Sequence, residues 1–254
     1  MTTLISSLVL PAAMAVAAGL IGSYALMRRM TLAADAMSHI ALPGIGVALL
    51  LNLHPLIGAL FALLAGAVLI WGLENRSGLA TETIIGVVFS AALAVGVLLT
   101  PGEQLMDALF GRPGTLSSLE LLLGLFVAGG VILFAIFARD RLVVSFVSQD
   151  IARTAGINVR RLNLLYLLAF ALTVAFGLRY LGALLMGSLV IIPSATARRL
   201  AGSLRSMLGI SVVVAVFSTL LGGWLAARLH RETGPMIVSV AAACFFLSLA
   251  VRRK

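Results

Sequence analysis

Long apolar runs, separated by short polar or basic segments, dominate this chain from end to end. Most of the runs are long enough to cross the roughly 30 Å hydrocarbon core of a bilayer as helices. Regular alternation of apolar and polar residues is absent, which favours helices over a membrane β-barrel. We place nine runs, each end set to within about two to four residues, at 4–27, 31–52, 55–73, 83–99, 119–138, 162–178, 180–197, 206–227 and 235–251. The pattern therefore predicts an all-α, polytopic transmembrane helix bundle of about eight or nine spans.

The composition supports a membrane protein that forms a single transmembrane domain over residues 1–254. Hydrophobic residues make up 61% of the chain and charged residues 11%, whereas soluble domains carry about 25% charged residues. The one cysteine, Cys244, allows neither an intrachain disulfide nor a thiolate metal cluster.

The basic residues predict the orientation of the bundle. Four of the 18 basic residues, Arg112, Arg179, Arg228 and Arg231, follow spans on one side, and the remaining 14 lie on the other side. Because basic residues accumulate on the cytoplasmic side, the N-terminus is predicted outside and the C-terminus in the cytoplasm. The net charge of +9 thus reflects topology, and we expect no nucleic-acid partner because no dense basic run with interleaved aromatics occurs.

Asp35 and His39 form the candidate functional site. They lie four residues apart in an otherwise apolar run, so on a helix their side chains share one face. A buried carboxylate is costly, so Asp35 is expected to face the bundle interior or a wet cavity and to find a partner. Three interpretations stay open from the pattern: Asp35 orients a neutral His39, the pair relays protons, or the pair binds a transition-metal ion in transit.

Other chemistry is largely excluded. A P-loop needs a lysine next to serine or threonine, and the only lysine is Lys254 at the end of the chain. Neither a His-Glu-x-x-His motif nor a second membrane aspartate is present, so a zinc or aspartyl protease is not expected. Ser38 and His39 are adjacent and diverge by about 100° around a helix, which is poor geometry for a nucleophile and its base. The sequence thus predicts no enzymatic activity in this chain.

Two further stretches carry candidate residues. Segment 139–161 is the longest predicted cytoplasmic excursion, and within it Asp150 is expected to cap a short helix that Gly156 ends in a left-handed conformation. Such a helix suits docking onto a soluble protein, although a plain solvated connector is the alternative. Gly182 and Pro193 mark a run suited to a moving or cavity-lining helix, because Pro193 removes one backbone hydrogen bond.

The chain resembles the membrane permeases of ATP-binding-cassette importers for zinc, manganese and iron, and is most similar to the zinc-uptake permeases. The resemblance extends over essentially all 254 residues. It rests on motifs in a fixed order: Gly22 with Leu26-Met27-Arg28-Arg29-Met30, Asp35-x-x-Ser38-His39-x-x-Leu42-Pro43-Gly44, Leu109-Phe110-Gly111, Asp150-x-Ala152-x-x-x-Gly156, Gly182-Ala183-Leu184-Leu185, Pro193-Ser194-Ala195-Thr196-Ala197-Arg198 and Gly234-Pro235.

This resemblance implies a permease that carries Zn, Mn or Fe(II) ions across a bacterial inner membrane, with no permanently bound cofactor. It implies a second permease copy, a cytoplasmic ATPase dimer that binds ATP, an external metal-binding protein and surrounding lipid as partners. It places Asp35 and His39 on the metal pathway, and Asp150, Ala152 and Gly156 on a helix that couples to the ATPase. The alternative is a proton-coupled secondary metal transporter that acts without an ATPase.

Overall fold

The computed structural model describes residues 2–30, 33–99, 118–181 and 183–250. The described residues are helical apart from short turns, which confirms the predicted all-α class. The helices are α1 (Thr2–Met27), α2 (Ala33–Leu50), α3 (Pro55–Ser77), α4 (Thr81–Leu99), α6 (Ser118–Phe137), α7 (Arg139–Val147), α8 (Gln149–Thr154), α9 (Val159–Leu181), α10 (Ala183–Leu200), α11 (Leu204–Leu229) and α12 (Thr233–Ala250).

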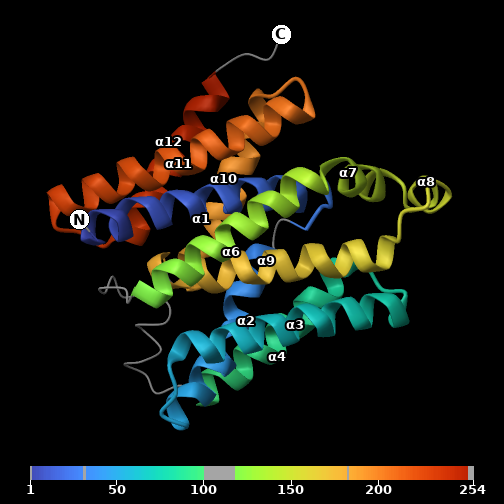
Figure 1. Ribbon diagram of the computed structural model, residues 1–254, viewed down its shortest axis with the longest axis horizontal. Coiled ribbons are helices and arrows are strands. Elements are labelled where there is room, and N and C mark those ends of the chain that lie inside the picture. Colours follow the sequence, from blue (N-terminus) through green and yellow to red (C-terminus); the bar gives the residue numbers. More distant parts are fainter. Residues whose placement is uncertain (1, 31–32, 100–117, 182, 251–254) are drawn as a thin grey trace.

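Each of the nine predicted apolar runs coincides with one long helix. Eight of these helices are long and apolar enough to cross a membrane: α1, α2, α3, α4, α6, α9, α11 and α12. The ninth, α10, has 18 residues and carries Arg198 and Arg199 in its last turn. In Figure 1, the start of α1 lies at one end of the bundle, and α7 and α8 lie at the other. The orientation of the bundle, with the C-terminus in the cytoplasm, stays a prediction from the distribution of basic residues.

The bundle has two outer groups of helices joined by a central one. In Figure 1, α2, α3 and α4 (blue to teal) lie on one side, and α11 and α12 (orange to red) lie on the other. Between them run α1, α6, α9 and α10, with α10 packing against α1, α2 and α11. The spans of α1 and α9 are 67% buried, against 22% for α4, α6 and α12. The central helices α1 and α9 are therefore packed mainly against protein, whereas α4, α6 and α12 expose most of their surface.

Glycines permit very close helix contacts around α2. A methyl group on Gly44 of α2 would collide with the Gly58 carbonyl oxygen of α3, and the reverse also holds. A methyl group on Gly96 of α4 would lie 2.7 Å from the Leu42 Cβ of α2. Small residues allow such close backbone approach, and in membranes packing replaces the missing hydrophobic drive between helices. These close contacts fix α2, and with it Asp35 and His39, between α3 and α4.

Candidate functional site

The Asp35 and His39 side chains lie on one face of α2, as their spacing predicts. The His39 Nε2 atom is 3.9 Å from the Asp35 Oδ1 atom, too far for a hydrogen bond. The two side chains differ in burial, because His39 is 12% exposed and Asp35 is 50% exposed. The pair is thus open at its carboxylate end and enclosed at its imidazole end.

Protein packing fixes the His39 ring. Its ring meets the edge of Phe89 on α4, with 5.4 Å between the centroids and 60° between the planes. The His39 Nδ1 atom is buried and has no hydrogen-bond partner in the described part of the chain. A buried imidazole nitrogen without a partner is costly, and such exceptions call for a functional explanation.

Asp35 sits in the first turn of α2, where the helix dipole favours a carboxylate. Its backbone is covered by Gly187 of α10, at which an added Cβ would stand 2.8 Å from the Asp35 Cα. Within the described part of the chain, His39 lies beside the Asp35 carboxylate, which is half exposed. Whether Asp35 faces the bundle interior or a wet cavity in the membrane stays a prediction.

Ser38 takes no part in this face of α2. It is fully buried, and its Oγ donates a hydrogen bond to the Ala34 carbonyl oxygen at 2.8 Å. This geometry supports the expectation that Ser38 and His39 do not form a nucleophile and base. Within the described residues no group of three or more His, Cys, Asp or Glu side chains is close enough to hold a metal. The described residues thus offer a two-donor site, with one carboxylate and one imidazole.

The predicted cytoplasmic excursion contains two short helices, α7 and α8, which project from one end of the bundle (Figure 1). The predicted N-cap is wrong by two residues. The cap of α8 is Ser148, whose Oγ accepts a hydrogen bond from the Ile151 backbone N–H at 3.3 Å. Asp150 lies inside the first turn, 92% exposed, with its Oδ1 3.6 Å from the Arg153 Nη1. Ser148 takes the cap because it has extended backbone angles, φ −154° and ψ 116°, where α7 ends.

The predicted end of this short helix is confirmed. Gly156 has φ +75°, and its N–H donates to the Arg153 carbonyl while the Ile157 N–H donates to the Ala152 carbonyl. This is a Schellman motif with glycine at its left-handed position. Ala152 is fully buried against the bundle, so α8 presents one face to the protein and the other outward.

Charged side chains at the start of α7 are solvated. The Arg139 Nε donates to the Asp140 Oδ1 at 2.8 Å. This hydrogen bond holds the pKa of the Asp140 carboxyl below its usual range. An ion pair of this kind at the protein surface contributes little stability.

The run that carries Pro193 forms α10, which continues as one helix from Ala183 to Leu200. Pro193 is buried, and the neighbouring Ser194 Oγ donates to the Val190 carbonyl oxygen at 2.9 Å. Ser211 of α11 lies 3.2 Å from the same hydroxyl and donates to the Gly19 carbonyl oxygen of α1. Gly182 lies outside the described residues.

Sequence reasoning missed three features of the site. Phe89 and Gly187 touch His39 and Asp35 from other helices, and nothing in the local pattern links them to α2. Nothing in the sequence indicates that Arg28 has a partner, yet it forms an ion pair with Glu74 of α3 at 2.5 Å. Glu74 itself gave a signal, since an acidic residue at the basic end of a span is unusual enough to search for a partner.

Comparisons with known proteins agree with the resemblance seen in the motifs. Residues 1–252 match the ABC 3 transport family. The chain is 30% identical over 243 residues to the high-affinity zinc uptake system membrane protein ZnuB of Haemophilus influenzae, covering 92% of each protein. It is 31% identical over 238 residues to the manganese transport system membrane protein MntC of Listeria innocua, covering 92% of this chain and 85% of that one.

A solved structure shares the fold. A chain of PsaBC from Streptococcus pneumoniae, in complex with Fab, superposes with a TM-score of 0.82 at 26% identity, covering 96% of this chain and 90% of that one. The likeness to multi-pass permeases and the eight candidate spans make this chain a multi-pass membrane protein. Because the family match extends over nearly its whole length, the chain belongs to the ABC 3 transport family.

Proposed function

We propose that this chain is the permease subunit of an ATP-driven importer for divalent transition metals, with zinc or manganese as the ion. The observation that carries the proposal is the Asp35–His39 pair, held on α2 between α3 and α4 in a chain of this family. Relatives named for zinc uptake and for manganese transport support both ions. In this proposal residues 1–254 form one permease domain in the bacterial inner membrane.

The geometry of the pair suits a transient metal ligand set. Metal–ligand bonds to imidazole nitrogen and carboxylate oxygen measure about 2.0–2.2 Å, so one ion can bridge two donors separated by up to roughly 4 Å. The observed 3.9 Å separation lies just inside that reach. A tetrahedral angle would need the donors closer, at about 3.4 Å, so a small side-chain rotation tightens the site. Weak binding of this kind lets an ion leave again, as transport requires.

A second permease copy would complete the coordination. One chain supplies two donors, whereas tetrahedral zinc takes four ligands. Two copies that meet at the exposed side of Asp35 would supply two carboxylates and two imidazoles. The half-exposed carboxylate at membrane depth supports this arrangement, because a charge facing lipid is disfavoured.

α10 forms one wall of the proposed pathway. Gly187 covers the Asp35 backbone, and Pro193 lies six residues further along the same helix. A proline-containing helix can adjust its hydrogen bonds at low cost, which suits a wall that opens and closes. In this proposal Gly182 and Pro193 belong to the pathway helix.

ATP hydrolysis would come from a separate cytoplasmic ATPase dimer docked on α8. Val147 and Ile151 are 74% and 60% exposed on this projecting segment, next to the charged Asp150. An apolar pair beside charges on a short, rigidly ended helix suits insertion into a groove of a soluble partner. Asp150, Ala152 and Gly156 are the coupling residues: Asp150 faces outward, Ala152 anchors the helix, and Gly156 fixes its end.

Reconstitution tests the proposal. In proteoliposomes that contain the permease, its ATPase and the external metal-binding protein, uptake of Zn²⁺ or Mn²⁺ should require ATP. Asp35→Ala and His39→Ala should each abolish uptake while the complex still assembles. Unchanged uptake in both variants would remove these residues from the pathway. Uptake by the permease alone, driven by a pH gradient, would replace the ATP-driven importer by a secondary transporter.

A further inference from the structure

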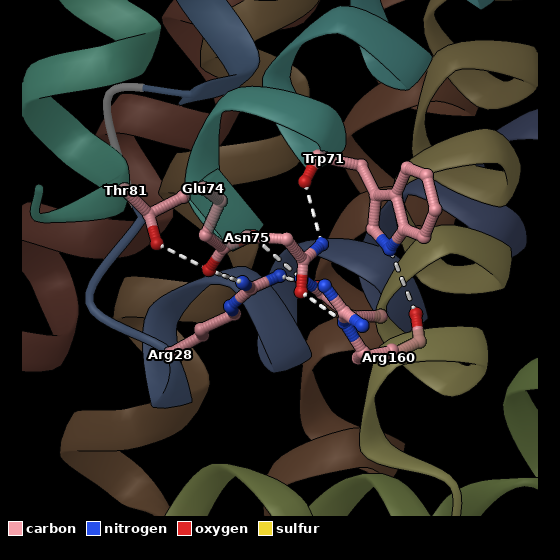
Figure 2. A network of polar contacts seen from close by, with 7 residues as sticks. Arg28, Trp71, Glu74, Asn75, Thr81 and Arg160 are labelled. Carbon is pink, nitrogen blue, oxygen red and sulfur yellow. Dashed lines mark hydrogen bonds and ion pairs between the residues drawn. The ribbon is translucent and has the colours of Figure 1, made fainter. Parts of the chain in front are cut away.

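Three side chains, from the α1–α2 turn, α3 and α9, close a polar ring at the end of the bundle that carries α7 and α8. The Arg28 Nη2 lies 2.5 Å from the Glu74 Oε1, and the Arg28 Nη1 donates to the Asn163 Oδ1. The Asn163 Nδ2 donates to the Glu74 Oε2 at 2.6 Å, so each member of the ring bonds both others. Figure 2 shows Arg28 reaching Glu74, with Thr81 of α4 donating to the same carboxylate oxygen at 2.7 Å.

A second set of contacts fixes α9 to α3 beside this ring. The Trp71 Nε1 donates to the Arg160 carbonyl oxygen, and the Arg160 Nε donates to the Asn75 Oδ1, both at 2.9 Å. The Asn75 Nδ2 in turn donates to the Trp71 carbonyl oxygen at 2.6 Å (Figure 2). The first turn of α9 is thus bound to the last turns of α3 through both side chains and backbone.

The ring is shielded from solvent. The side chains of Arg28 and Glu74 are only 11% and 16% exposed. The Arg28 guanidinium also lies 5.7 Å from the centre of the Phe146 ring on α7, within the range of a cation–π contact. Planar guanidinium groups match such multiple partners, whereas a lysine offers one point charge.

Arg28 occupies the turn that leads into α2. The Arg29 N–H donates to the Leu26 carbonyl and the Met30 N–H donates to the Ala25 carbonyl, which ends α1 in a Schellman motif. Arg29 is the left-handed residue of this motif, with φ +60°, and Met30 is buried. α2 begins at Ala33, so Asp35 is only seven residues beyond Arg28.

The ring therefore stands between two regions that the proposed function joins. On one side, α8 ends at Thr154, and α9 begins at Val159 with Asn163 in its second turn. On the other side, α1 leads into α2 with Asp35 and His39, and Thr81 begins α4, which carries Phe89. A displacement of α8 that moves the start of α9 pulls on Arg28 and Glu74 through Asn163.

We propose that Arg28 is a positioning residue for metal transport, which ties the start of α9 to the α1–α2 turn so that motion of the coupling segment reaches Asp35 and His39. This inference rests on the proposed function. It assigns Arg28 no contact with the metal, and it makes the closed ring of Arg28, Glu74 and Asn163 the mechanical link. Without the link, motion of α8 and of the start of α9 moves the α1–α2 turn less.

The test uses the complete transporter in proteoliposomes, with Zn²⁺ and Mn²⁺ each as the probe and uptake and ATP hydrolysis measured in the same vesicles. Arg28→Met should lower the metal ions taken up per ATP hydrolysed about tenfold, a typical size for coupling between sites. Glu74→Gln should act in the same direction. Arg76→Gln is the matched control, because Arg76 is exposed in the same last turn of α3 and outside the ring.

A double variant separates positioning from folding. Each single variant leaves a partly buried charge without its partner and should reduce the amount of assembled complex, whereas Arg28→Met with Glu74→Gln removes both charges. We expect the double variant to recover the amount of complex but not the uptake per ATP. Recovery of both would reduce the ring to a structural role and overturn the inference.

If the double variant does not assemble, Arg28→Lys distinguishes a positioning role of Arg28 from a purely structural one. It keeps the charge but cannot bond Glu74 and Asn163 in the same planar geometry. Lower uptake per ATP in assembled Arg28→Lys complex supports the inference, and wild-type uptake per ATP overturns it. A wild-type complex that takes up neither ion under ATP would instead contradict the proposed function, independently of the variants.

Discussion

Gly187 on α10 lies against the backbone of Asp35 on α2, with no room for a side chain between them. An added Cβ would stand 2.8 Å from the Asp35 Cα and 2.9 Å from its backbone nitrogen. Since backbone atoms cannot rotate aside, any larger residue has to push α2 and α10 apart. The contact thereby sets where the Asp35 carboxylate stands relative to the pathway wall.

We expect Gly187→Ala to lower metal uptake about tenfold, since a displacement near 1 Å at a reacting group can cost more than that. The helices should still form, because alanine is the better helix former. Gly129→Ala is the matched control, since Gly129 on α6 has open space where the added Cβ would stand. Uptake should be measured against the amount of assembled complex, and equal uptake in the two variants would contradict the role given to Gly187.

Phe89 should influence how tightly the pair binds its ion. Its edge contact holds the His39 ring, and aromatic pairs of this kind contribute about 0.5–1.5 kcal/mol. Phe89→Leu keeps an apolar residue of moderate size but releases the ring. We expect the metal concentration for half-maximal uptake to rise between about twofold and tenfold, with the maximal rate less affected. A change in maximal rate alone would place Phe89 in gating rather than in ligand orientation.

The order of the nine long helices among the described residues could be predicted from sequence, but α7 and some helix ends could not. The run at 55–73 stops where polar residues begin, whereas α3 continues to Ser77. Glu74 and Asn75 remain helical because they bind Arg28 and Arg160, which come from distant parts of the chain. Hydropathy registers their polarity and cannot register partners 46 and 85 residues away.

The candidate site, too, could be predicted from sequence only in part. That Asp35 and His39 share one face of α2 follows from helix geometry alone, and the structure confirms it. The unequal burial of the two side chains depends on Phe89 and on how α10 packs, which are tertiary facts. At α8 two capping residues compete within three positions, and the end of α7 selects Ser148 over Asp150. A glycine in the sequence also does not reveal whether another helix packs on it: Gly58 packs on α2, while Gly86 faces open space.

The conformation of Gly156 predicts a difference between two otherwise similar glycines. Gly156 and Gly78 both have positive φ, +75° and +66°, and both have open space where a Cβ would stand. Alanine at either position should cost about 1–2 kcal/mol of strain. We expect Gly156→Ala to lower metal-stimulated ATPase activity severalfold and Gly78→Ala to leave it unchanged at equal complex recovery.

Gly156→Pro should have the stronger effect and uncouple ATP hydrolysis from transport. Proline fixes φ near −65° and removes the N–H that donates to the Arg153 carbonyl. The end of α8, and so its direction, cannot be kept. Metal-stimulated ATP turnover at the wild-type level in this variant would show that α8 does not couple the two reactions.

Ile151 should supply much of the contact energy between the permease and its ATPase. It is 60% exposed on α8, and burying such a side chain contributes roughly 1.5–3 kcal/mol. We expect Ile151→Ser to weaken binding of the purified ATPase to the permease in detergent by about tenfold or more. Leu79→Ser is the matched control, because Leu79 is 55% exposed in the α3–α4 turn at the same end of the bundle but outside α8. Equal affinity for wild-type and Ile151→Ser permease would mean that the ATPase docks elsewhere, since loss of a buried aliphatic anchor from a small interface cannot go unnoticed.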